Sequence, residues 1–83
     1  MSPKLPVVKA KDVVRVAKKL GFNFDHQKGS HAVYRREKDN ARVVIPMHAG
    51  KDLRPKTLAG ILDDMDVTQA EFQRLLREQI VYP

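Results

Sequence analysis

Two short turn signals in the middle of the chain constrain its fold more than any other feature. Gly29-Ser30 and Asp39-Asn40 tolerate the tight backbone of a turn, and they separate the stretches 22–28, 31–38 and 42–47. Each stretch has the length and residue types of one strand. Because such short turns cannot carry a crossover connection, consecutive strands must run antiparallel. The sequence therefore predicts a three-stranded antiparallel meander.

The apolar residues of the outer two strands indicate how far each is buried. Phe22 and Phe24 alternate with polar residues, as in a strand with one buried face. Val43 and Ile45 show the same alternation in the third strand, but Val44 lies between them. An apolar residue at this position favours burial of the third strand on both faces.

Helical periodicity flanks the predicted sheet on both sides. Apolar residues recur at helical spacing over 10–20, basic residues occupy the opposite face, and Gly21 follows as a C-terminal cap. After the sheet, Pro55 opens a second helix over 55–65, since proline has no N–H to lose at the first helical position. Both helices need a sheet to bury their apolar faces.

A capping box indicates one further helix. Thr68 and Glu71 have the required spacing of a hydroxyl and a carboxylate, which predicts a helix over 68–79. The order is then helix, strand, strand, strand, helix, with a C-terminal helix added, which defines an α+β fold. The helices can cover one face of the sheet and leave the other open, as in double-stranded-RNA-binding domains. We expect a single domain over 1–83, with its core in about 5–65.

Charge and composition limit the partners and the cellular setting of the chain. Its 83 residues include 16 lysines and arginines against 10 acidic residues, which gives a net charge of +6, and the pI is near 9.9. Such a basic chain favours a nucleic acid or an acidic protein as partner. There is no cysteine and no apolar run of the roughly 20 residues that span a bilayer, so we expect a soluble, cytoplasmic protein.

His31 begins the second predicted strand and is the main candidate for chemistry. An imidazole can take up or release a proton near neutral pH, and basic residues lie close to His31 in the sequence. Strand alternation puts Arg35 on the face of His31 and Arg36 on the other. We expect Lys28 and Arg35 to hold phosphate. The alternatives are a structural strand histidine and an ordinary solvated rim of charge.

Three further residues are candidates for phosphate contact. Ser30 offers a hydroxyl beside His31, although serine in a tight turn more often bonds locally. His48 and Lys51 lie in the loop after the third strand, where His48 either transfers a proton, bonds the loop or caps the next helix. Three histidines without cysteine, and without a close His-x-x-x-His pair, make a poor metal site. We therefore predict no metal and no cofactor.

An ordered series of short motifs resembles the HicA toxin family. The series is Leu20-Gly21-Phe22, Gly29-Ser30-His31, Val44-Ile45-Pro46-Met47-His48, Leu53-Arg54-Pro55, Thr57-Leu58 and Ile61-Leu62. The resemblance implies a small, ribosome-independent toxin with a double-stranded-RNA-binding-like fold, which cleaves mRNA and is paired with a HicB-like antitoxin. It also implies that His31, in the Gly-Ser-His motif, is the catalytic histidine.

Functions of two other classes fit the same residues. A non-catalytic RNA-binding module would use the basic surface without needing a histidine at position 31. A protein-interaction domain would use it to dock an acidic partner. The resemblance favours a metal-independent endoribonuclease, with His31 as general base, general acid or both.

Overall fold

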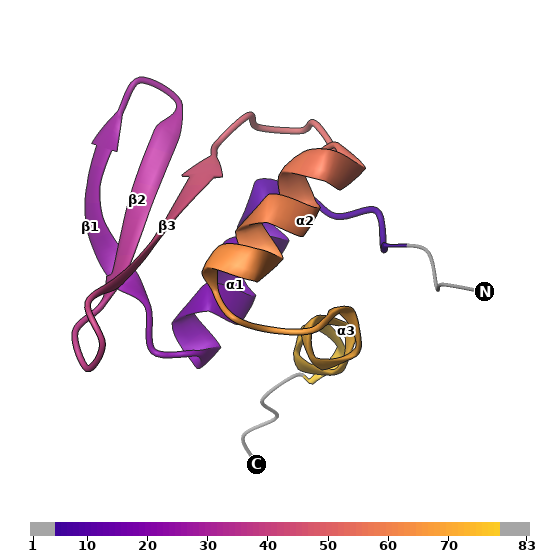
Figure 1. Cartoon of the computed structure of the whole chain (residues 1–83). Coiled ribbons are helices and arrows are strands. Elements are labelled where there is room, and N and C mark those ends of the chain that lie inside the picture. The colour runs from indigo at the N-terminus through magenta and orange to yellow at the C-terminus, as the bar shows by residue number, and fades with distance from the viewer. Residues whose placement is uncertain (1–4, 79–83) are drawn as a thin grey trace, which may run out of the picture.

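The computed structural model describes residues 5–78 and contains the predicted elements in the predicted order (Figure 1). They are α1 (Ala10–Lys19), β1 (Asn23–Lys28), β2 (His31–Arg36), β3 (Ala41–Pro46), α2 (Pro55–Asp64) and α3 (Gln69–Arg77). This confirms the α+β class and the extra C-terminal helix. Residue 79, the last one predicted for that helix, lies outside the described residues.

The three strands form one antiparallel sheet in the order β1-β2-β3, as predicted from the turns. α1 and α2 lie on the same side of this sheet, and α3 lies beyond them, next to α1 (Figure 1). The core between sheet and helices consists of buried apolar side chains from every one of these elements except β1, among them Val13, Val16, Ala32, Tyr34, Val43, Ile45, Leu58, Ile61, Leu62 and Phe72. Within residues 5–78, no helix lies on the opposite face of the sheet.

The first strand is not half-buried, contrary to the prediction. Phe22 is fully buried but precedes β1, and every residue of β1 is exposed, including Phe24 at 54%. α1 and α2 pack on β3, whereas β1 pairs only with β2, so the helices do not reach over the outermost strand. The ring of Phe24 instead meets the edge of the Tyr34 ring, with 5.7 Å between centroids.

The third strand is buried on one face only, so the interpretation of Val44 was also wrong. Val43 and Ile45 are fully buried against the helices, while Val44 between them is 39% exposed. Val44 lies directly opposite Val33 of β2, and cross-strand partners share a face. These two valines therefore lie on the open face of the sheet, which we call the outer face.

Two basic side chains of α1 fasten α3 to the domain. Arg15 donates a hydrogen bond to the carbonyl oxygen of Leu76 at 3.0 Å, and Lys19 donates one to that of Leu75 at 2.7 Å. Carbonyl groups in the last turn of a helix lack partners within the helix, and cations stabilise them. No helix within residues 5–78 is both long and apolar enough to cross a membrane.

Candidate active site

A pocket between the end of the sheet and the first turn of α2 is the main candidate for a functional site. It has a volume of about 570 Å³. Its lining comes from β2, from β3, from the 47–54 loop and from α2, and consists of His31, Val44, Pro46, His48, Lys51, Asp52, Leu53, Arg54 and Thr57. We refer to it as the histidine pocket. It unites three predicted site residues, His31, His48 and Lys51.

His31 is held rigidly by the backbone, while its side chain is free. A two-residue turn with Gly29 at φ +58° delivers it to the first position of β2. Because β2 is the central strand, His31 is paired with Lys28 of β1 and with Pro46 of β3. Its side chain is exposed and makes no hydrogen bond to any part of the chain that the structure describes. An exposed imidazole with both nitrogens available, carried on a backbone that is paired on both sides, is suited to proton transfer.

His26 provides a contrast on the same sheet. Its Nδ1 lies 2.7 Å from a carboxylate oxygen of Asp25, so this ring is already engaged. It does not line the histidine pocket.

The loop that carries His48 and Lys51 is anchored at both ends. The Lys51 N–H donates to the His48 carbonyl at 3.1 Å, and the Leu53 N–H donates to the Val8 carbonyl at 2.8 Å. Asp52, the one acidic residue of the pocket lining, forms an ion pair with Lys9 at 3.0 Å. The remaining charged and titratable side chains of the lining are His31, His48, Lys51 and Arg54, so the pocket is electropositive.

The first turn of α2 adds to this positive potential. Pro55 occupies the first helical position as predicted, and no acidic residue lies in the first turn. The N-terminal end of a helix carries partial positive charge and unpaired N–H groups, which favour anions. Arg54 and Thr57 from this end line the pocket, and the sequence analysis did not select them. Both residues lie close to Pro55, the first residue of α2, and this position in the sequence was the signal that could have identified them.

The other three predicted site residues lie outside the pocket. Lys28 is directly opposite His31 and shares the outer face with it. Ser30 is half-buried, and its carbonyl oxygen accepts a hydrogen bond from the Met47 N–H, which closes the end of the sheet. Arg35 lies further along β2 on the outer face, opposite Arg42 of β3. The sequence analysis did not select Arg42, because its pairing depends on the register of two strands.

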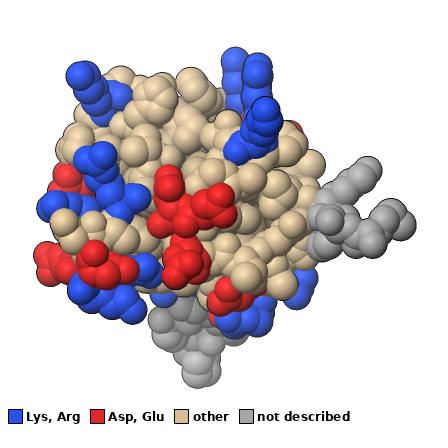
Figure 2. All heavy atoms as spheres, viewed as in Figure 1, with Lys and Arg blue, Asp and Glu red and all other residues tan. Residues whose placement is uncertain are grey.

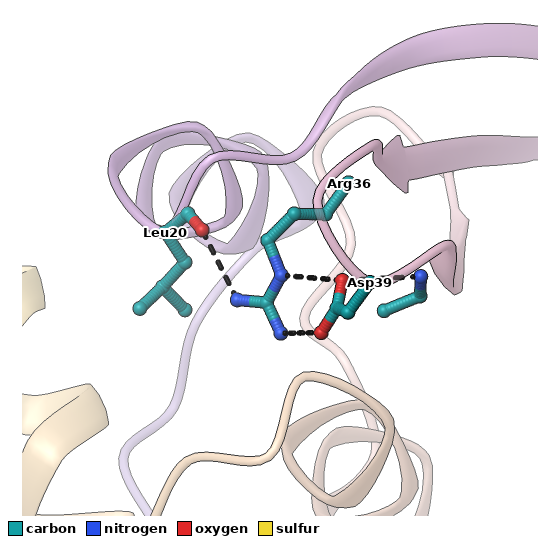
Figure 3. Close-up of polar contacts among 4 residues, drawn as sticks. Leu20, Arg36 and Asp39 are labelled. Carbon is teal, nitrogen blue, oxygen red and sulfur yellow. Dashed lines mark hydrogen bonds and ion pairs between the residues drawn. The ribbon is translucent and has the colours of Figure 1, made fainter.

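Arg36 points to the helix side of the sheet, as strand alternation predicts (Figure 3). Its guanidinium lies 4.5 Å from the centre of the Phe22 ring and donates to the Leu20 carbonyl at 3.1 Å. It also makes two hydrogen bonds to Asp39, at 2.9 and 3.1 Å. These bonds lower the pKa of the Asp39 carboxyl below its usual value and raise the pKa of Arg36. Arg36 is therefore a structural residue that joins the end of α1 to the turn after β2.

Among residues 5–78 there is no group of three histidine, cysteine, aspartate or glutamate side chains placed to hold a metal ion. The chemical groups that the histidine pocket offers are imidazoles, cations, a hydroxyl, the N-terminal end of α2 and one carboxylate, which is paired with Lys9. Such groups transfer protons and stabilise developing negative charge.

Fold and site together define a small basic α+β protein with a cationic, histidine-containing pocket of the kind that suits an anionic, phosphate-bearing ligand. A family model described as "HicA toxin of bacterial toxin-antitoxin" matches residues 10–67, which is most of the chain and extends from α1 to the end of α2. The protein belongs to the HicA toxin family. The resemblance seen in the sequence is thereby confirmed, and the family implies a cognate antitoxin. A comparison with curated proteins found no match.

Proposed function

We propose that this toxin is an endoribonuclease that cleaves mRNA in the histidine pocket without a metal ion. One observation carries the proposal. The exposed imidazole of His31, free of hydrogen bonds to the described chain, is fixed on the central strand at the wall of an electropositive pocket. Membership of the HicA toxin family supports the same function.

Cleavage of RNA by its own 2′-hydroxyl needs only proton transfer and charge stabilisation. The 2′-hydroxyl loses a proton and its oxygen attacks the adjacent phosphorus, while the bond from phosphorus to the 5′-oxygen breaks. The departing 5′-oxygen gains a proton, and the product keeps a 2′,3′-cyclic phosphate. A neutral histidine can take the first proton near pH 7, and a protonated one can supply the second.

The pocket residues divide these tasks. His31 is the general base, the general acid or both, and His48, which also lines the pocket, is the second proton-transfer group. Lys51, Arg54 and the N-terminal end of α2 stabilise the charge that develops on the phosphoryl oxygens. Lys28 and Ser30 hold the adjacent phosphate beside His31.

The cognate antitoxin, in our proposal a HicB-like protein, acts by covering this site in the cytoplasm. With a net charge of +6, the toxin attracts an acidic partner and accelerates its docking. Groups of the partner that occupy the pocket exclude RNA, which is the simplest form of inhibition.

The direct test compares His31→Ala with His26→Ala, since both remove an exposed histidine from the same sheet. We expect wild-type protein and His26→Ala to cleave single-stranded RNA in excess EDTA and to leave cyclic or 3′-phosphate ends. His31→Ala should lose at least about 100-fold in rate, the usual contribution of a general acid or base. Its free energy of unfolding should change by about 0.5 kcal/mol or less, as for other surface substitutions.

Three results would contradict the proposal. Wild-type-like cleavage by His31→Ala would remove His31 from the reaction. Loss of all activity in EDTA, with recovery on adding a divalent ion, would show that the reaction needs a metal. RNA binding without any cleavage by the wild-type protein would favour the non-catalytic RNA-binding module.

A further inference from the structure

Two arginines face each other on the outer face of the sheet. Arg35 of β2 lies directly opposite Arg42 of β3, both are exposed, and neither forms an ion pair or side-chain hydrogen bond with any residue in 5–78. Like charges directly opposite each other on a sheet are destabilising. The third residue of this row, Asn23 on β1, is uncharged and does not compensate. The pair therefore lowers the stability of the fold, as groups retained for binding commonly do.

The arginine pair is connected to the histidine pocket by an apolar strip. Val33 and Val44 are opposite each other one row closer to His31, and Val44 also lines the pocket. Arg35 is four residues from His31 along β2, which is roughly 13 Å at the rise of an antiparallel strand. The outer face thus presents His31 with Lys28, then a row in which Val44 is exposed, Val33 is buried and His26 is the β1 member, and then two cations.

We propose that Arg35 and Arg42 form a second phosphate-binding site for the single-stranded RNA whose scissile phosphate lies in the histidine pocket. The inference rests on the proposed function, because the pocket fixes where the first phosphate lies. Two guanidinium groups side by side provide paired donors that match phosphate oxygens. The exposed surface of Val44 between the two cationic sites accepts a ribose or base. Cationic sites on either side of an apolar surface suit single-stranded RNA, which has both phosphates and bases. They suit a uniformly acidic protein surface less well.

The test separates binding from cleavage. Affinity is measured with a 12-nucleotide RNA carrying 2′-O-methyl groups, which cannot be cleaved, over a series of salt concentrations. Cleavage is measured on a dinucleoside monophosphate, which is too short to reach the arginine pair from the pocket. The variants are Arg42→Ala and Arg42→Glu, and Lys18→Ala on the exposed side of α1 is the matched control for lost charge.

We expect Arg42→Ala to weaken binding of the 12-mer and to reduce the slope of log affinity against log salt by roughly 0.7, the value for one lost phosphate contact to a single strand. Arg42→Glu should weaken binding further and raise the Tm, because it replaces repulsion with a cross-strand ion pair to Arg35. Both variants should cleave the dinucleotide at the wild-type rate, and Lys18→Ala should leave the affinity, the salt slope and the cleavage rate unchanged.

Affinity and salt slope of Arg42→Ala equal to those of Lys18→Ala would overturn the inference. Weaker binding of the antitoxin with unchanged binding of RNA would also overturn it and would assign the pair to an acidic protein. The inference and the proposed function can be contradicted independently of each other. A wild-type protein without nuclease activity contradicts only the latter, while the non-cleavable 12-mer still reports on Arg42.

Discussion

At the scale of single residues, neighbouring arginines have opposite roles because strand alternation sends them to opposite faces. Arg35 is exposed and unpaired within the described chain, whereas the side chain of Arg36 is only 14% exposed and contacts Phe22, Leu20 and Asp39. The planar guanidinium of Arg36 stacks on the Phe22 ring and at the same time donates two hydrogen bonds to the Asp39 carboxylate. Lysine has no group of that shape.

We therefore predict that Arg36→Ala destabilises the protein by about 1–3 kcal/mol, through loss of the cation–π contact and of the bond to a backbone carbonyl. Arg35→Ala should leave the stability unchanged or slightly increase it, because it removes repulsion from Arg42. Urea unfolding of both variants measures the difference. Equal destabilisation by the two substitutions would contradict the division of roles.

At the scale of elements, the N-terminus of α3 is stabilised by a capping box that includes a titratable group, the carboxyl of Glu71. The Thr68 N–H donates to the Glu71 carboxylate at 3.0 Å, and the Glu71 N–H donates to the Thr68 hydroxyl at 3.0 Å. The first of these bonds, aided by the threonine side chain, holds the pKa of Glu71 below its usual value. Phe72, the next residue, is fully buried, so this cap positions a core residue.

The lowered pKa of Glu71 predicts a pH dependence of stability. Its ionised form stabilises the fold at pH values above the unfolded-state pKa of about 4.3, and this contribution is lost as the pH falls through the lower folded-state pKa. Glu71→Gln should have a lower Tm than the wild type at pH 7, and the two Tm values should converge in acid. A Tm difference that stays constant from pH 7 to pH 3 would show that Glu71 contributes nothing through its charge.

At the scale of the whole molecule, charge is unevenly distributed over the surface of residues 5–78. The outer face of the sheet carries Lys28, Arg35 and Arg42, and the histidine pocket continues this positive region. Figure 2 shows acidic side chains gathered near the centre of the view, over the end of α2, with basic side chains around them. Asp63, Asp66 and Glu71 line a separate cavity of about 530 Å³ between α2 and α3. A polyanion or an acidic partner is therefore directed to the sheet and pocket.

For the antitoxin complex, the positive potential of the pocket and the outer face predicts where amide hydrogens become protected. Exchange should slow in the 29–36 segment and in the 47–54 loop on binding of the antitoxin, while the α2–α3 connection stays unchanged. Association should slow as salt is raised, because the attraction is electrostatic. Protection confined to α1 would refute steric blocking of the site and would indicate an allosteric mode of inhibition.

The sequence by itself determined the elements and their order, because the signals involved are local. Gly29-Ser30 and Asp39-Asn40 fixed the meander, Pro55 began α2, and the Thr68 capping box began α3. The pocket brings together His31, His48 and Lys51, three residues that the sequence analysis selected from charge, position and resemblance. The chemistry that they perform remains a prediction.

Only the tertiary structure decided which surfaces are open and which distant residues meet. Phe24 and Val44 have apolar side chains suited to burial, yet both are exposed, since the helices cover only one face of the sheet and stop short of β1. The Arg35–Arg42 pair requires the register of β2 against β3, and the pocket requires the first turn of α2 beside the end of the sheet. Long-range packing sets these relations, and a one-residue change of register would send each of these strand side chains to the other face.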